Sequence, residues 1–560
     1  MLNSSRRISP TNLSLLFVAA LMLPVVILAF TEHNPFWVSV ACVVMPLGGY
    51  TLFASLARRS CVMVWLGLPL IFFSAFQVVL LYLFGNSVIA SDMFLNMLTT
   101  NLTEAGELLG NIYPALIAVI IIYTPMLVLA LVHIIKRRLL RHRIRIRMAA
   151  TGATIFLVGC LVLVLSGRYD VSRIVRDELF PVNAVYNLGL AVSESRKIKR
   201  FDESSANFRY KASRTATPKC REVYVLVIGE ASRAASWQLF GYQRATNPLL
   251  SKRDDLYLFD NITTQSNTTH KSVPLILSSV HTSQHDELYR RKGIPALFNE
   301  AGFTTYFISN QSPQGAMIDL LARDAHHIIY TDSQHLDMQL AQAMRQALEE
   351  DKSQKILFIL HTYGSHFSYR QRYPREFAHF LPDDEVSVRR RNTQTIRNAY
   401  DNSILYTDFV LSEIISTLAR EDGVAAAMLY CADHGEDIFD EGKRRFLHSS
   451  PRVTYHQLHI ASLAWFSPTY CKLFPQKVEA AALNKSVPAT TYAIFHTLAD
   501  MASITSPYIE PRSSLVNTYY DFGAVRYYLN DHNRAVRLTP DIGIDSYERS
   551  LFQRHGIRRL

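Results

Sequence analysis

Two apolar runs in the sequence each end in side chains that bind metals. The run at 223–228 is followed by Glu230, and the run at 425–432 is followed by Asp433 and His434. Because the carboxyl ends of parallel strands lie at the same rim of an α/β sheet, we expect these three side chains to lie close together there. Carboxylate and imidazole ligands together suit a divalent metal such as zinc. An acidic residue after one strand is common, but two strands that end this way favour a metal site.

A third segment supplies a hydroxyl group that such a metal could activate. Residues 267–274 follow an expected strand that ends near residue 261, and they include Thr269. A threonine hydroxyl is a poor nucleophile at neutral pH unless a metal or a base lowers its pKa. The alternative is that Thr269 caps a helix that begins near Ser272. The local sequence by itself favours this capping role.

Three histidines lie in segments that should reach the same rim. His361 and His366 follow the apolar run at 356–360, and His448 comes soon after His434 in the chain. A loop of that length can fold back over a metal, which would let His366 and His448 meet a second metal or a substrate phosphate. A lone histidine is more often a structural residue, so each of these assignments keeps that alternative.

Strand and helix patterns alternate between about residues 219 and 513. This alternation predicts a mostly parallel sheet covered by helices on both faces. The expected strands are 223–228, 256–260, 304–309, 327–331, 355–361, 425–432 and 459–466, and the expected helices are 294–301, 336–350, 396–420 and 490–502.

The first third of the chain has a different character. It contains long apolar runs, each near or above the ~20 residues that a membrane-spanning helix requires. They lie at about 13–30, 36–56, 62–85, 112–135 and 148–167. The first run could be a cleaved signal peptide, but four more runs follow it and no clear cleavage site is seen. We therefore predict a transmembrane domain with five spans.

Basic residues predict how these spans are oriented. Arg6-Arg7, Arg58-Arg59 and the basic cluster at 136–147 occupy alternate loops, and the two other loops contain no Lys or Arg. Short loops rich in Lys and Arg stay in the cytoplasm, so the N-terminus should be cytoplasmic and everything after residue 167 external. Much of the net charge of +11 lies in this cytoplasmic cluster, where anionic lipid explains it better than nucleic acid does.

These patterns divide the chain into four parts. We expect a transmembrane domain at 1–167, a polar and irregular linker along the membrane surface at 168–215, a catalytic domain at 216–513 and a tail packed on that domain at 514–560. Only Cys220, Cys431 and Cys471 of the six cysteines follow the spans, so the external part is not a disulfide-stapled domain.

Six short stretches carry a resemblance to a known family. They are VIGEASR (227–233), FGYQRATNP (240–248), LHTYGSH (360–366), QRYP (371–374), YDNS (400–403) and ADHGE (432–436). Together they resemble the membrane-bound phosphoethanolamine transferases of the alkaline phosphatase and sulfatase superfamily, over roughly residues 220–510. The five preceding spans match the architecture of that family. The resemblance therefore implies an alkaline-phosphatase-like (sulfatase-type) α/β domain behind a five-helix membrane domain.

The resemblance assigns roles to the residues at the rim. It implies that Glu230, Asp433 and His434 are zinc ligands and that Thr269 is the zinc-bound residue that takes the phosphoethanolamine. The remaining two residues, His366 and His448, match positions that contact substrate phosphate or a second zinc ion.

The resemblance also gives a meaning to the outer loop between the third and fourth spans. Asn96, Thr100 and Glu104 are spaced by four, so on a helix they form one polar stripe. By pattern alone this stripe is a solvated helix face. In the family, such a stripe holds the headgroup of the donor phosphatidylethanolamine, and Glu104 would face its ammonium group. A lipid donor also explains why the catalytic domain is tethered to a membrane.

Two departures from the family bear on the acceptor. The sequence has few cysteines, with Leu275 where members that modify lipid A carry one. It thereby resembles the branch that modifies the phosphorylated heptose of the lipopolysaccharide core, as do residues 308–311 and 513–517. The resemblance implies a monomer in the bacterial inner membrane, with a periplasmic catalytic domain. The favoured acceptor is the core heptose phosphate, and lipid A and Kdo remain alternatives.

Three other functions were weighed against this reading. A sulfatase carries a modified Cys or Ser in a Cys-x-Pro-x-Arg-like motif, where this chain has THKSVP (269–274). A phosphoglycerol transferase would lack the outer-loop stripe in this form. A membrane sensor or scaffold with an inactive domain would require a missing metal ligand, and none is missing.

Overall fold

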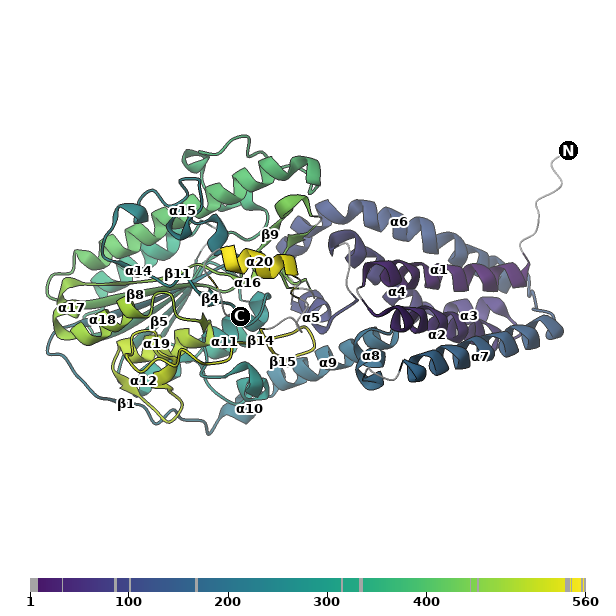
Figure 1. Cartoon of the computed structure of the whole chain (residues 1–560), viewed down its shortest axis with the longest axis horizontal. Helices are drawn as coiled ribbons and strands as arrows, with labels where there is room; N and C mark the ends of the chain where they lie inside the picture. The colour runs from purple at the N-terminus through teal and green to yellow at the C-terminus, as the bar shows by residue number, and fades with distance from the viewer. Residues whose placement is uncertain are drawn as a thin grey trace. The chain divides into compact units, whose positions relative to one another are not determined.

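The computed structural model of the chain is shown in Figure 1. It describes residues 9–32, 34–84, 88–99, 102–166, 170–313, 316–331, 336–443, 445–450, 453–538, 544, 546–554 and 557. The chain divides into two compact units, one of residues 1–98 and 102–193 and one of residues 99–101 and 194–560.

The first unit is helical. Four of its described segments are apolar and long enough to cross a membrane: α1 (Pro10–Thr31), α2 (Phe36–Ser55), residues Tyr113–Ile135 of α6 (Leu102–Ile135), and α7 (His142–Leu165). A fifth candidate is the pair α3 (Ser60–Leu66) and α4 (Leu68–Phe84), which are bent relative to each other by 59°. Four to five spans among the described residues agree with the prediction.

The expected third span at 62–85 is therefore a broken helix. The break lies at Gly67, and Pro69 follows in the first turn of α4, where a missing backbone N–H is tolerated. A Cβ atom at Gly67 would lie 2.5 Å from Cζ of Phe17. A side chain at this position would thus have to displace the buried ring of Phe17 in α1. An apolar run shows its length but not such a bend.

The entry to α5 (Ser91–Thr99) is fixed by three amide side chains around one buried residue. The backbone N–H of Ile89 donates to Oε1 of Gln77 at 2.9 Å, and the side chains of Asn183 and Asn187 donate to the carbonyl of Ile89 at 3.1 and 2.7 Å. Buried polar groups of this kind stabilise a structure only when they are paired. Here they hold the backbone just before α5.

The linker at 168–215 was predicted to be irregular, but the structure shows that it is largely helical. It contains α8 (Val171–Asp177), α9 (Val182–Lys199) and α10 (Phe201–Ser205). Residues 183, 184, 187 and 191 of α9 are buried with a helical period, but two of them are asparagines. Because the buried face of this helix is partly polar, a hydrophobicity pattern does not show it.

The second unit is built on a seven-stranded sheet with strand order β3-β11-β8-β2-β7-β5-β6. The strands are β2 (Glu222–Gly229), β3 (Leu256–Leu258), β5 (Thr304–Ser309), β6 (His327–Tyr330), β7 (Lys355–His361), β8 (Ala425–Ala432) and β11 (Ser462–Phe466). The five neighbouring strands β8, β2, β7, β5 and β6 are parallel, and β11 runs antiparallel both to β8 and to the edge strand β3. The prediction of a mostly parallel sheet is confirmed.

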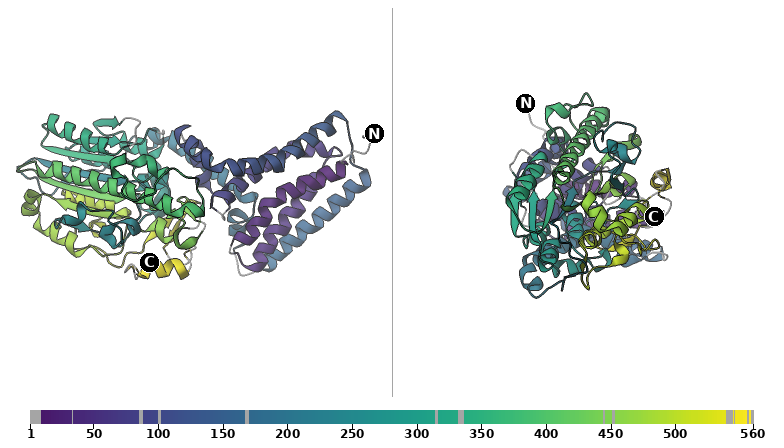
Figure 2. Two further views of the ribbon diagram at one scale, coloured as in Figure 1. Left: turned by 90° about the horizontal axis from the view of Figure 1, so that it is seen from above. Right: turned by 90° about the vertical axis from the view of Figure 1, so that its left-hand side faces the viewer.

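The sheet is central because its inner strands are apolar on both faces. In β2, Tyr224 and Leu226 face one hydrophobic cluster, and Val223 and Val225 face the other. Helices cover both faces of the sheet (Figure 2). The first cluster includes α11 (Thr269–Ile276), α12 (Ile294–Glu300), α13 (Met317–Ala322) and α19 (Tyr492–Met501), and the second includes α14 (Met338–Glu350) and α15 (Thr393–Ala419).

Shorter elements complete this unit. The remaining helices are α16 (Tyr455–Leu458), α17 (Pro468–Leu473), α18 (Pro475–Leu483) and α20 (Ser546–Arg554). Four small strand pairs are β1 (Ser213–Arg214) with β13 (Ile504–Thr505), β4 (Ile262–Thr263) with β12 (Ala489–Thr490), β9 (Asp437–Ile438) with β10 (Phe446–Leu447), and β14 (Tyr527–Leu529) with β15 (Ala535–Arg537). All six cysteines are free thiols.

The tail at 514–560 contacts the segment that contains Thr269. The backbone N–H of Leu529 donates to the carbonyl of Gln265 at 2.7 Å, and Nζ of Lys271 donates to the carbonyl of Asn530 at 3.1 Å. The tail thus helps to hold the start of α11 in place.

Candidate metal centre and active site

Glu230, Asp433 and His434 come together at the carboxyl rim of the sheet. One ligand atom from each lies within 4.8 Å of the other two, and all three residues are buried. Their positions follow from strand register, because Gly229 at the end of β2 pairs with Ala432 at the end of β8. Nε2 of His434 lies 3.6 Å from Oε1 of Glu230 and 3.4 Å from Oδ2 of Asp433.

The electrostatics of this triad fit a bound cation. Burial, followed by repulsion from Asp433 and Glu436, raises the pKa of Glu230 well above its usual range. Burial raises the pKa of Asp433 to about 6, and burial together with the charge of nearby His448 lowers the pKa of His434. Oε1 of Glu230 is buried without a hydrogen-bond partner among the described residues. Two carboxylates, one of which has an unpartnered oxygen, and a neutral imidazole match the ligand set that zinc prefers.

The backbone around the triad is strained to hold it. Ala231 has a positive φ of 52°, which costs a residue with a Cβ roughly 1–2 kcal/mol. Its N–H donates to Oδ1 of Asp433 at 3.1 Å, and its carbonyl accepts from the hydroxyl of Tyr400 at 2.6 Å. Opposite it, Gly364 has a φ of 51°, and a Cβ there would lie 2.6 Å from the carbonyl oxygen of Glu230. These contacts fix the turn that presents the first carboxylate.

Thr269 is turned toward the triad. Its Oγ1 lies 3.2 Å from Oε2 of Glu230 and 3.1 Å from Nε2 of His434. The capping alternative does not hold in the structure, because the helix begins at Thr269 itself and Thr268 occupies the N-cap position. The positive end of a helix favours anions. A phosphoryl group on Thr269 would therefore lie at a favourable helix terminus.

The predicted histidines differ in their surroundings. The rings of His434 and His448 lie 4.1 Å apart by centroid, and Nδ1 of His448 lies 2.9 Å from Oε1 of Glu436. His366 is near enough that its charge contributes to the lowered pKa of His434. His361 is buried beside Ser309, and burial lowers its pKa to about 4. His361 is therefore a neutral structural histidine, as the alternative reading allows.

Two residues at the site were not assigned a role from the sequence. Nε2 of Gln311 donates to Oε2 of Glu230 at 3.3 Å and to the carbonyl of Thr362 at 2.9 Å. Glu436 accepts from the hydroxyl of Tyr369 at 2.6 Å in addition to its contact with His448. Gln311 follows β5 just as Glu230 follows β2, so its place after a strand was the signal that could have identified it.

The outer-loop stripe is only partly described. The backbone of Asn96 lies in α5 and that of Glu104 lies in α6. Thr100 lies outside the described residues, as do the side chains of Asn96 and Glu104. Their role as a headgroup site stays a prediction.

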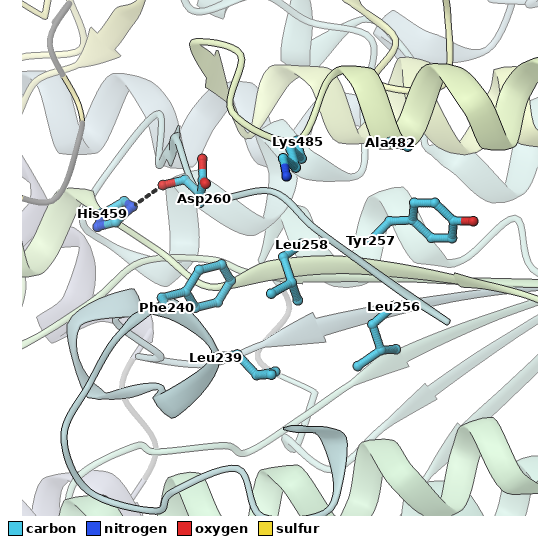
Figure 3. Close-up of a pocket in the computed structure, with 9 residues that line it drawn as sticks. All are labelled: Leu239, Phe240, Leu256, Tyr257, Leu258, Asp260, His459, Ala482 and Lys485. Carbon is cyan, nitrogen blue, oxygen red and sulfur yellow. Dashed lines mark hydrogen bonds between the residues drawn. The ribbon is translucent and has the colours of Figure 1, made fainter. Parts of the chain in front are cut away.

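A cavity of about 510 Å³ lies elsewhere, along the edge strand β3 (Figure 3). Its wall includes Phe240, Tyr257 and Leu258, with the polar residues Asp260, His459 and Lys485 at one side. The ring of His459 is hydrogen-bonded through Nε2 to the carbonyl of Asp260 at 2.8 Å. No predicted site residue lines this cavity. The groups able to do chemistry are gathered at the triad instead.

Comparisons with known proteins match both the N-terminal and the C-terminal parts of the chain. A family model described as Sulfatase matches residues 222–504, and one described as Phosphoethanolamine transferase EptA/EptB matches residues 50–195. The putative transferase YhbX of Escherichia coli K12 is 31% identical over 251 residues, which is 44% of this chain and 44% of the relative. The chain thus spans about half the length of the curated relatives it matches.

Solved structures show the same fold. The integral membrane protein lipooligosaccharide phosphoethanolamine transferase A (EptA) from Neisseria meningitidis is 21% identical, with a TM-score of 0.70 over 90% of this chain and 97% of that one. The C-terminal periplasmic domain of EptC from Escherichia coli, in complex with Zn, is 23% identical, with a TM-score of 0.52 over 58% and 94%.

The sulfatase match carries the family assignment. It covers half of the chain and includes β2 and β8, whose ends present Glu230, Asp433 and His434. The chain therefore belongs to the sulfatase family, and its N-terminal region matches the model of the EptA/EptB phosphoethanolamine transferases.

Proposed function

We propose that this protein transfers phosphoethanolamine from phosphatidylethanolamine to a lipopolysaccharide acceptor, with Thr269 as the nucleophile. The observation that carries the proposal is the position of the Thr269 hydroxyl, which lies 3.2 Å from Glu230 and 3.1 Å from His434 at a buried metal-ligand triad. The match of residues 50–195 to the EptA/EptB model supports phosphoethanolamine as the transferred group.

Zinc is the cofactor that we propose for the triad. Glu230, Asp433 and His434 would hold it, and the zinc complex of the EptC domain supports this choice. When bound, zinc would lower the pKa of a neighbouring hydroxyl and stabilise negative charge on phosphoryl oxygens.

The side chains of the protein position the reacting groups. Glu230 holds Oγ1 of Thr269 by a hydrogen bond. That oxygen attacks the phosphorus of the donor, the Thr269 hydroxyl loses its proton, and diacylglycerol leaves with a proton. An acceptor hydroxyl or phosphate oxygen then attacks the phosphorus of the phosphoethanolamine on Thr269, the bond between that phosphorus and Oγ1 breaks, and Oγ1 takes up a proton again. With the carboxylate of Glu436 accepting from Nδ1 of His448, Nε2 of His448 is left to take and return protons in both steps.

The membrane unit would supply the donor. Asn96, Thr100 and Glu104 are proposed to bind the phosphatidylethanolamine headgroup, with Glu104 facing its ammonium. We place the N-terminus in the cytoplasm and the catalytic unit on the periplasmic side of a bacterial inner membrane. The proposed acceptor is the heptose phosphate of the lipopolysaccharide core, with lipid A and Kdo as alternatives.

The test is to trap the intermediate. The full-length protein, incubated with phosphatidylethanolamine and no acceptor, should gain one phosphoethanolamine group, which mass spectrometry of its peptides should place on Thr269. Thr269→Ala should gain none. Thr268→Ala is the matched control, since the Thr268 hydroxyl faces Ser266 at 3.3 Å rather than the triad, and it should keep the adduct.

Two results would contradict this proposal. One is an adduct on Thr268 or Ser272, and the other is full transfer by Thr269→Ala. An adduct formed from phosphatidylglycerol but not from phosphatidylethanolamine would instead identify a phosphoglycerol transferase.

A further inference from the structure

Three consecutive arginines form an exposed basic run in the catalytic unit. Arg389, Arg390 and Arg391 are all exposed, and no ion pair involves them among the residues that the structure describes. We call them the arginine run. Three adjacent cations on an open surface form a concentrated positive charge.

Two of the three acidic residues at 383–385 have other partners. Asp383 pairs with Arg370 at 3.4 Å, and Glu385 accepts from the side chain of Gln371 at 2.6 Å. The positive charge of the run also does not stabilise α15. This helix begins at Thr393 and has no acidic residue in its first turn. Cations near the amino end of a helix are unfavourable by about 0.3–1 kcal/mol each. The folding of the chain thus gives no reason for this charge.

The run lies against the loop that carries two site residues. A Cβ atom on Gly442 would lie 3.3 Å from Nη2 of Arg390, so this guanidinium contacts the loop at Gly442. That loop connects β9 with β10, and the pair is flanked by Glu436 before β9 and by His448 after β10. Glu436 and His448 lie 2.9 Å apart at the site.

The other described cations of this loop are already paired. Lys443 and Arg445 both contact Glu548, at 3.3 and 2.5 Å. Arg397 of α15 lies 3.4 Å from Asp440, which is also paired with Arg233. Among the described cations of this loop and of the arginine run, those of the run are therefore the ones that no ion pair involves.

We propose that the arginine run binds phosphate groups of the acceptor saccharide, next to the position that receives phosphoethanolamine. This inference rests on the proposed function and names the residues that recognise its phosphorylated acceptor. Guanidinium groups bind phosphate through paired hydrogen bonds. Phosphatidylethanolamine has no net charge, whereas a phosphorylated saccharide is strongly anionic. The run should thus act on the acceptor step and not on the donor step.

The experiment compares two triple variants of the full-length protein in detergent. In the first, Arg389, Arg390 and Arg391 are each replaced by Gln. The matched control replaces Lys219, Lys352 and Arg420 by Gln, which removes the same charge. These exposed residues lie near the amino ends of β2, β7 and β8, at the opposite rim of the sheet.

Three measurements are made on each protein. They are the rate of adduct formation on Thr269 from phosphatidylethanolamine, the KM and kcat for a phosphorylated core oligosaccharide, and the calorimetric affinity for that oligosaccharide before and after it has been dephosphorylated. Electrostatic attraction of a charged substrate changes association by about tenfold or more. In the arginine variant, KM for the phosphorylated acceptor should rise about tenfold, whereas kcat and adduct formation stay within twofold. The control variant should behave as the wild type.

The phosphate is the group whose recognition is tested. The dephosphorylated oligosaccharide should bind with the same affinity to the wild type and to the arginine variant, because the run then has no partner. An unchanged KM for the phosphorylated acceptor in the arginine variant would overturn the inference. So would a loss of adduct formation in the arginine variant when the donor measurement is repeated in vesicles with anionic lipid, because the run would then bind the membrane surface.

A failure of the proposed function would be distinguishable. If the wild type forms no adduct with phosphatidylethanolamine, then the transferase assignment fails. Binding of the phosphorylated oligosaccharide to the resting protein, measured by calorimetry, still tests the run. Binding that weakens about tenfold in the arginine variant supports the inference, and equal binding refutes it.

Discussion

Replacing Glu230 by glutamine should have opposite effects on stability with and without metal. Oε2 of Glu230 accepts from the Thr269 hydroxyl and the Gln311 amide, and the carbonyl oxygen of a glutamine can accept from both. The substitution therefore keeps the shape of the site and removes one negative charge. That charge lies within 4.8 Å of a ligand atom of Asp433.

The size of the effect follows from this distance. Two unit charges 4.8 Å apart repel by about 3 kcal/mol at an effective dielectric constant of about 20. Burial and Asp433 raise the pKa of Glu230. In the metal-free wild type, Glu230 therefore either repels Asp433 or binds a proton that removes the repulsion, and both states cost free energy at pH 8. Metal-free Glu230→Gln should therefore be more stable than the metal-free wild type at pH 8, by about 3 kcal/mol.

Zinc should reverse this order. A ligand present at about 1,000 times its Kd stabilises a protein by about 4 kcal/mol, and the variant loses one of the three proposed ligands. The assay is denaturant unfolding of chelator-treated protein at pH 8, with and without added zinc, together with the zinc content of each sample. Glu222→Gln is the matched control, because Glu222 lies at the other end of β2 and pairs with Arg214 at 2.6 Å. It should destabilise the protein equally with and without zinc.

The reasoning about the triad would be refuted by either of two results. In the first, chelator-treated Glu230→Gln is less stable than the chelator-treated wild type. In the second, zinc stabilises Glu230→Gln as much as it stabilises the wild type.

Three further predictions concern other parts of the molecule. Glu104→Gln should slow transfer from phosphatidylethanolamine vesicles about tenfold or more, because a charge-assisted hydrogen bond is lost; a normal rate would leave the stripe as a solvated face. Glu436→Gln should slow transfer by a similar factor without loss of zinc, because His448 loses a charged partner at 2.9 Å; transfer at the wild-type rate would exclude this role. Burial raises the pKa of Asp408 to about 6. Asp408 therefore stabilises the fold by about 3 kcal/mol below about pH 4, and this contribution is lost as the pH rises to 6. Unfolding curves of Asp408→Asn should lack this component, and parallel pH profiles for variant and wild type would contradict it.

The sheet and the triad could be predicted from the sequence because they depend on strand patterns. The runs at 223–228 and 425–432 are apolar along their whole length, as buried parallel strands are. Once both are parallel and adjacent, their ends must meet, and Glu230, Asp433 and His434 meet with them. The position of Thr269 could not be settled in this way. Its role as a cap depended on a helix start near Ser272, whereas the helix begins at Thr269 and Thr268 occupies the cap position.

Other features depend on contacts between distant segments. α9 was missed because its buried face contains Asn183 and Asn187, whose partner is the backbone of Ile89. The contact of Gln311 with Glu230 depends on how a loop after β5 folds toward β2. The bend at Gly67 depends on the approach of Phe17. The polar face of α9 and the bend at Gly67 carry no local signal of these partners, and Gln311 is marked only by its place after a strand.

The order of strands in the sheet also determines when the protein can fold during its synthesis. β2 ends at Gly229, but its two neighbours end at His361 and Ala432. At roughly 5–20 residues per second, the ribosome adds the intervening ~200 residues in roughly 10–40 s. For that time the apolar strand β2 has no partner on the side of β8, and such unpaired strands are prone to aggregation. Zinc could be captured only afterwards, so a chaperone that shields this strand should raise the yield of active protein, whereas added zinc should not replace it.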